Sequence, residues 1–211
     1  LPGLVGPSGV DWSRVRVWMV DERYVAAGDP LRNDDEAWTG FLRHCPGVEL
    51  VRMPSADQYG ADGLEEATAA FARTWERLMG ARSFDTALIG MGPDGHICSL
   101  FPHHRALDSP GPVLRVPDSP KPPPQRITVS MAVMRSCRSL WLVAPGAAKA
   151  GAIAAAQYSY LPSGVQFIAD TDGTRASGRA LVTAVVAWWK TLPEEERPRL
   201  LLYGESLGVV A

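Results

Sequence analysis

The residues best suited to chemistry lie in one stretch, ALIGMGPDGHICSLFP, at 87–102. His96 carries an imidazole that can take a proton from water at neutral pH and return it to a leaving oxygen. Asp94 is placed to orient that imidazole or the attacking water. Glycines around this pair permit a tight turn whose peptide N–H groups come close to a ligand. They are Gly90, Gly92 and Gly95.

Two interpretations of this turn stay open. The pattern predicts a general base in a ligand-binding loop, but a histidine that caps a helix and glycines that only turn the chain explain it about as well. The G-x-G-x-x-G spacing matches a dinucleotide fingerprint, yet Asp and His replace the small residues that a pyrophosphate needs. The pattern is therefore not a dinucleotide fingerprint.

Two cations lie where an anion would be bound. Arg23 follows the apolar run VRVWMV, which is typical of a buried parallel strand, and ligands bind at the carboxyl edge of such sheets. Its planar guanidinium suits a phosphate or carboxylate group. Lys149 falls in the first turn of a helix expected from about residue 146, where free N–H groups and the helix dipole favour an anion. A solvated side chain is the competing interpretation for each.

Strands and helices alternate along the chain. Apolar runs predict strands over 15–24, 84–90, 126–130, 139–145 and 199–203. Capped, periodic segments predict helices over 33–45, 60–80, from 146 and over 175–190. The proline run at 117–124 indicates a semi-rigid surface loop. This order predicts an α/β fold, a Rossmann-like layered and mostly parallel sheet flanked by helices.

Composition and charge limit the classes of ligand that this protein could bind. A net charge of −2 over 211 residues gives no field for nucleic acid or an acidic membrane, so a small anionic metabolite is the expected ligand. Cys45, Cys98 and Cys137 are too far apart in sequence to indicate a disulfide framework or a zinc site, and we expect no metal and a cytoplasmic location. We find neither a membrane-spanning run nor a signal peptide. Without an initiator Met, a fragment or processed product is expected.

Three segments together resemble one known family. VDERYV followed by Asn33, then GMGPDGHICSLFP, then LWLVAPGAAKA, are similar to the glucosamine-6-phosphate isomerase and 6-phosphogluconolactonase family over about residues 9–156. The DGHICSLFP stretch favours its lactonases. The resemblance implies hydrolysis of 6-phospho-D-glucono-1,5-lactone to 6-phosphogluconate in the oxidative pentose phosphate pathway, without metal or cofactor. His96 is then the general base and Asp94 its partner.

The same resemblance implies that Arg23 and Lys149 hold the 6-phosphate and that Asn33 and the glycines line the substrate loop. It also marks two departures. Members of the family begin with a strand, a glycine-rich Ser/Thr phosphate loop and a helix, and that first unit is expected to be missing before Leu1. Arg32 stands at a position that is often Ser, just before Asn33.

The C-terminal part resembles another family. Residues 157–211 are similar to the start of an α/β-hydrolase catalytic domain, with GESLG as the nucleophile elbow and Ser206 as its nucleophile. We therefore expect two domains, a lactonase-like one at 1–156 and an incomplete hydrolase-like one at 157–211. The mismatch between them predicts a monomer or weak self-association.

Three alternatives to the lactonase remain. The first is an aldose-ketose isomerase acting on sugar phosphates. The second is an inactive or binding-only composite of a lactonase and a truncated serine hydrolase. The third is a serine hydrolase that uses Ser206.

Overall fold

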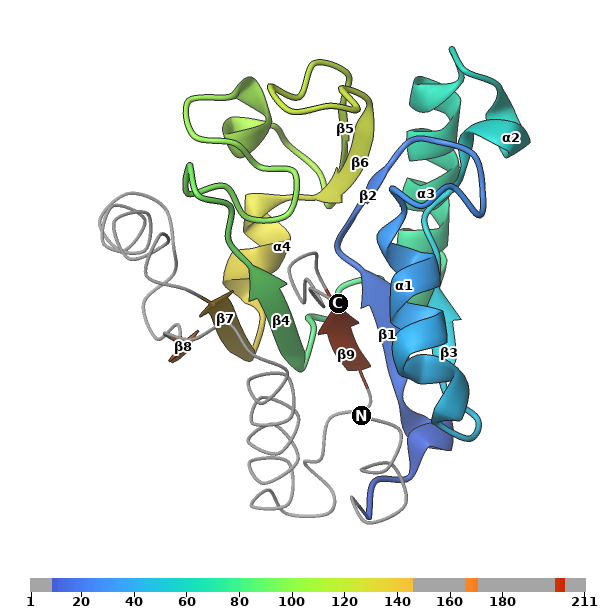
Figure 1. The fold of residues 1–211 in the computed structure, drawn as a ribbon, viewed down its shortest axis with the longest axis vertical. Helices are drawn as coiled ribbons and strands as arrows, with labels where there is room; N and C mark the ends of the chain where they lie inside the picture. Colours follow the sequence, from blue (N-terminus) through green and yellow to red (C-terminus); the bar gives the residue numbers. More distant parts are fainter. Residues whose placement is uncertain (1–8, 146–165, 171–199, 204–211) are drawn as a thin grey trace.

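A computed structural model of the protein describes residues 9–145, 166–170 and 200–203 (Figure 1). The described strands are β1 (Arg16–Met19), β2 (Asp21–Arg23), β3 (Glu49–Val51), β4 (Thr86–Gly90), β5 (Val113–Val116), β6 (Arg126–Val129), β7 (Ser139–Pro145), β8 (Gln166–Asp170) and β9 (Leu200–Tyr203). The α-helices are α1 (Asn33–Gly40), α2 (Ala56–Tyr59), α3 (Leu64–Leu78) and α4 (Met131–Ser136). Short 3-10 helices are η2 (Trp12–Arg14), η3 (Leu42–His44) and η4 (Arg105–Asp108).

The strands form two sheets. The larger one has the order β3-β1-β9-β4-β7-β8, and each of its strand pairs is parallel. The smaller one has the order β2-β6-β5 and is antiparallel. Figure 1 shows the small sheet beyond the carboxyl ends of the large sheet's strands. The predicted α/β class with a mostly parallel sheet is confirmed.

The strand predicted over 15–24 is two strands. β1 ends at Met19, and the chain bends at Val20 before β2 begins at Asp21 and pairs antiparallel with β6. Arg23 therefore lies opposite Arg126 in the small sheet. The prediction that Arg23 follows a strand of the large sheet directly is therefore wrong, because the bend at Val20 puts Arg23 in the small sheet. The apolar run did not reveal the bend because both segments are buried.

The core of the large sheet is aromatic. Helix α3 presents Phe71 and Trp75 from its buried face, as its apolar spacing predicted. Both rings meet Trp18 of β1 edge-on, with centroid distances of 5.9 Å and 5.2 Å, and Trp18 is fully buried. Such edge contacts suit the charge distribution of aromatic rings. They fix α3 against β1 and so support the strand that leads into the site.

Three elements differ from expectation. None of β3, β5 and α4 was predicted. β5 has only four residues, and its partner β6 follows a proline-rich connection, so neither length nor a tight turn signalled the pair. β6 was a correct strand prediction, but it belongs to the antiparallel sheet.

Strand β9 comes from the part of the chain with hydrolase-like sequence. It pairs in parallel with β1 on one side and with β4 on the other, for example through Leu202, which is opposite Trp18 and Ala87. The predicted strand at 199–203 is thus present as Leu200–Tyr203. Because β9 is central, the continuity of the large sheet depends on it.

We expect Leu201→Pro to disrupt the large sheet. Proline removes a ladder hydrogen bond and is excluded from central strands, so the free energy of unfolding should fall by at least about 1 to 3 kcal/mol, the cost of a buried group left unpaired. The control is Ile168→Pro in β8, which ends the strand order among the described residues and pairs with β7 alone. Chemical denaturation measures both; equal loss in the two variants would contradict the central position of β9.

Candidate active site

The turn after β4 is closed by its own backbone. The peptide N–H of Gly92 donates to the carbonyl of His96 at 2.8 Å, and that of Gly95 donates to the carbonyl of Gly92 at 3.0 Å. Gly95 has a φ of +89°, which a residue with a side chain rarely adopts. These constraints bring Asp94 and His96 to the same side of the turn. His96 lies in this turn. It does not begin or cap a helix, which was the competing interpretation of the sequence.

Asp94 and His96 form a close pair. His96 Nδ1 lies 2.6 Å from Asp94 Oδ1, and the imidazole stacks on the ring of Phe101 with a centroid distance of 4.5 Å. An ionised carboxylate only accepts hydrogen bonds, so Nδ1 carries the proton that it donates. The other ring nitrogen, Nε2, is then left with its lone pair. This is the tautomer that a general base requires.

Gly92 leaves the space that this pair occupies. A Cβ at position 92 would lie 2.1 Å from both Cε1 and Nδ1 of His96, and 2.6 Å from Asp94 Oδ1. Contacts this short are not tolerated, so either the glycine stays or the imidazole moves. The sequence argument assigned Gly92 to a turn and to contact with a ligand. The structure adds a steric reason within the chain itself.

The ionisation states follow from the neighbours. Burial raises the pKa of Asp94, but hydrogen bonds from Lys121 and His96 outweigh it and bring that pKa to about 2. Burial lowers the pKa of His96, and although Asp94 opposes this, the pKa remains below the ordinary value. His96 is therefore neutral, and Asp94 is charged, at neutral pH.

The small sheet contributes a buried carboxylate, that of Asp21 at the start of β2. Asp21 has no exposed surface, and its Oδ2 accepts a hydrogen bond of 2.7 Å from Ser99. Within the described part of the chain, Oδ1 has no hydrogen-bond partner. Burial raises the pKa of Asp21, and the hydrogen bond from Ser99 and the charges of Arg23 and Arg126 act against that rise. The charge of Asp21 in turn raises the pKa of His96, so the small sheet and the turn are linked electrostatically.

Arg23 and Asn33 meet at Glu22. The carboxylate of Glu22 accepts backbone hydrogen bonds of 2.9 Å from Arg23, Asn33 and Asp34, the last two at the start of α1. Burial raises the pKa of Glu22 to about 7. The guanidinium of Arg23 donates to the carbonyl of Leu31. Asn33 is buried, and its Nδ2 has no hydrogen-bond partner among the described residues.

Arg32, the departure noted beside Asn33, has a structural role. It is 4% exposed and makes a two-point contact with Asp34, at 2.8 Å and 3.1 Å. It also donates to the carbonyl of Met53 at 2.8 Å. The long side chain is thus fully used within the fold, where it anchors the start of α1.

Sequence reasoning missed Lys121 and Arg126. Lys121 Nζ lies 2.8 Å from Asp94 Oδ1, although its proline-rich loop was predicted to be only a surface connection. Arg126 lies over the ring of Phe101 at 5.6 Å. The one available signal for Lys121 was a cation flanked by prolines, which fix its backbone.

Other predictions fall elsewhere. Lys149 and Ser206 lie outside the described residues, so their predicted roles remain predictions.

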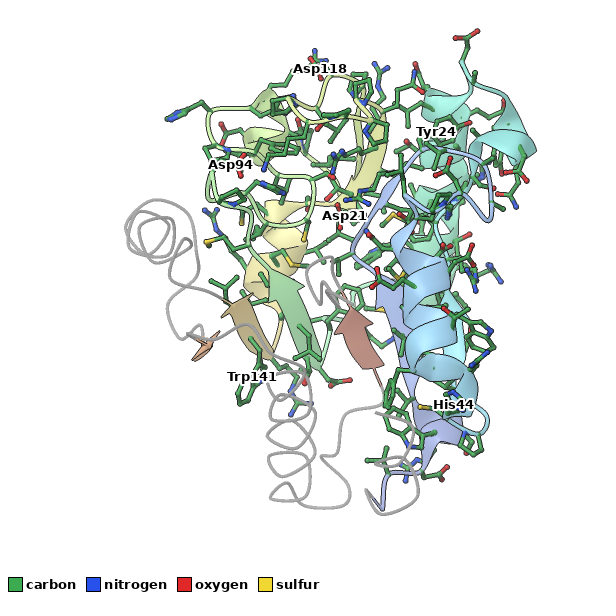
Figure 2. The ribbon with its side chains drawn as sticks, in the orientation of Figure 1. Asp21, Tyr24, His44, Asp94, Asp118 and Trp141 are labelled. Carbon is green, nitrogen blue, oxygen red and sulfur yellow. The ribbon has the colours of Figure 1, made fainter. Side chains whose placement is uncertain are left out.

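His44 lies at the far end of the molecule from Asp94 (Figure 2). Among the described residues, no group of three His, Cys, Asp or Glu side chains is arranged to hold a metal, and no helix has the length and apolar character to cross a membrane.

Two curated relatives are named 6-phosphogluconolactonase. A 6-phosphogluconolactonase of Streptomyces coelicolor is 37% identical over 86% of this chain and 71% of its own length. That of Mycobacterium leprae is 40% identical over 70% of this chain, which spans 62% of that relative. A family model for α/β-hydrolases matches residues 141–211.

Solved structures show the same fold. A 6-phosphogluconolactonase from Shewanella baltica has a TM-score of 0.65 at 23% identity, with 77% of this chain and 75% of that one covered. A monomeric glucosamine-6-phosphate deaminase has a TM-score of 0.62 at 19% identity, with 85% and 80% covered. The model for glucosamine-6-phosphate isomerases/6-phosphogluconolactonase matches residues 4–169. With this match over most of its length, the chain belongs to the glucosamine-6-phosphate isomerase and 6-phosphogluconolactonase family.

Proposed function

We propose that the chain hydrolyses 6-phospho-D-glucono-1,5-lactone to 6-phosphogluconate, with His96 as the general base. The observation that carries this proposal is the Asp94–His96 pair, at 2.6 Å, with Nδ1 committed to the carboxylate and Nε2 left to accept a proton. The names of its relatives supply the substrate class. A lactone is an activated ester, so no covalent nucleophile is needed.

The steps balance without another reactant. His96 Nε2 takes a proton from water as the water oxygen attacks the lactone carbonyl carbon. The tetrahedral intermediate then expels the ring oxygen, and the imidazolium returns its proton to that oxygen. Asp94 stabilises the transient positive charge on the ring and keeps the imidazole oriented. The net result is addition of one water molecule across the ester bond.

The phosphate of the substrate needs cations. Arg23 and Lys149 are the proposed pair, and a guanidinium can contact two phosphate oxygens at once. Arg23 is on β2, which begins at Asp21. The charge of Arg23 acts on the carboxylate of Asp21, and that carboxylate acts on the pKa of His96. The proposed phosphate ligand and the proposed base thus both interact with one buried carboxylate, which supports a shared site.

Replacing His96 tests the base. His96→Gln should lower kcat by at least about 100-fold, since proton transfer by a positioned base contributes that much, while 6-phosphogluconate should bind as before. Rates are measured on freshly made lactone and corrected for its spontaneous opening. His44→Ala, at an exposed position remote from Asp94, is the control. Activity retained in His96→Gln would refute this mechanism.

Gly92→Ala tests the packing of the pair. The added methyl would displace the imidazole, and misplacing a catalytic group by about 1 Å can cost about 100-fold in rate. Gly40→Ala is the matched control, because a Cβ there meets no atom within 4 Å. Lactonase rates and melting curves are compared for both variants. An active Gly92→Ala enzyme would mean that the Asp94–His96 contact is not needed.

Arg23→Ala tests the phosphate site. Loss of a charge-assisted contact should weaken 6-phosphogluconate binding by about 1.5 to 3 kcal/mol, measured by calorimetry. Arg138→Ala is the control, since that side chain, just before β7, is 57% exposed and pairs with Asp85, just before β4. Unchanged affinity in a folded Arg23→Ala protein would exclude Arg23 as a phosphate ligand.

A further inference from the structure

Lys121 contacts the candidate base pair from a separate loop. Its Nζ lies 2.8 Å from Asp94 Oδ1 and 3.3 Å from His96 Nδ1. The same carboxylate oxygen therefore receives both the imidazole and the ammonium. Asp94 and Lys121 are each about one third exposed, whereas the His96 side chain is 12% exposed. The three groups are in mutual contact, and the least exposed of them is the proposed base.

The backbone of Lys121 is held in place. Ser119 Oγ accepts from the N–H of Lys121 at 3.2 Å and donates to its carbonyl at 3.0 Å. Arg126, itself only 2% exposed, donates to the carbonyls of Lys121, Pro122 and Pro123 at 3.2 to 3.3 Å. An ordinary surface lysine contributes little because its long side chain must be ordered in water. Here the loop is already ordered by a buried guanidinium.

The loop is also tied to the segment after the turn. His104 Nε2 lies 3.1 Å from Asp118 Oδ1, and Arg105 Nη2 lies 3.3 Å from Asp118 Oδ2. Arg126 lies over one ring, Phe101, on which His96 stacks. Arg126 thus contacts both Phe101, on which the imidazole stacks, and the backbone of Lys121. A displacement of the loop would reach His96 by two routes.

We propose that Lys121 is a positioning residue for His96, whose ammonium group holds Asp94 in place and offsets its charge so that the imidazole stays neutral with Nε2 available. The catalytic part of this inference rests on the proposed function. The effect of Lys121 on Asp94 and His96 does not depend on that function. Asp94 alone would do two opposed things. It would orient the ring, but its negative charge would also favour the imidazolium, which is no base.

The charges that face His96 set the direction of the effect. Burial lowers the pKa of His96, Asp94 from the same turn and Asp21 from β2 raise it, and Lys121 from the proline-rich loop lowers it. Arg126 of β6 faces the same region across Phe101. Removing Lys121 should therefore raise the pKa of His96. A base is active only when unprotonated, so the loss of activity on acidification should then begin at higher pH.

The test compares Lys121→Met with Lys121→Arg. Nuclear magnetic resonance of the imidazole, assigned with His96→Gln, should show the titration of His96 moved to higher pH in Lys121→Met and largely restored in Lys121→Arg. The acid limb of kcat/KM should move in the same direction, with a several-fold loss on the acid side. Arg138→Met removes an exposed cation from Asp85, away from the Lys121 loop, and is the control that should leave His96 unchanged.

Each outcome decides the proposal. A Lys121→Met protein in which His96 titrates as in the parent would overturn it, and so would one in which the affinity for 6-phosphogluconate falls without a change in that titration, since Lys121 would then contact the ligand. Lys121→Gln is the second variant if Lys121→Met does not fold. A parent chain that hydrolyses no lactone would refute the proposed function, yet the titration would still test the role of Lys121.

Discussion

The absence of a side chain at position 92 is the constraint on which the candidate site depends. The imidazole of His96 and a carboxylate oxygen of Asp94 occupy the volume that a Cβ would fill, and so they meet at 2.6 Å. A hydrogen bond this direct to an ionised carboxylate fixes the tautomer of the ring as well as its orientation. The chemistry proposed for the turn follows from that one arrangement.

The two sheets supply what the turn cannot. The turn follows β4 of the large parallel sheet, and the aromatic packing of Trp18 against α3 supports β1 in the same sheet. The small sheet carries Asp21 and Arg126 on adjacent strands. It thereby places charged groups beyond the carboxyl ends of the parallel strands, the edge at which ligands bind in α/β proteins. Strand β9 joins β1 to β4, so the two halves of this scaffold are held together by a segment from the C-terminal part of the chain.

Sequence patterns predicted what depends on local order. The long amphipathic spacing of α3, the apolar run of β4 and the proximity of Asp94 to His96 are all set by neighbours in sequence. The bend at Val20, the pairing of β5 with β6 and the approach of Lys121 depend on contacts between distant segments, which periodicity does not encode. A proline-rich stretch indicates stiffness, but not which surface it will lie against. Lys121 reaches Asp94, 27 positions away in sequence, because Arg126 binds its loop from within the fold.

The central claim is that His96 is neutral with its proton on Nδ1. Nitrogen-15 nuclear magnetic resonance of the imidazole at neutral pH tests it most directly, because protonated and unprotonated ring nitrogens resonate far apart. The account predicts a protonated Nδ1 and an unprotonated Nε2 for His96. A proton on Nε2 alone, or an imidazolium with both nitrogens protonated, would contradict it.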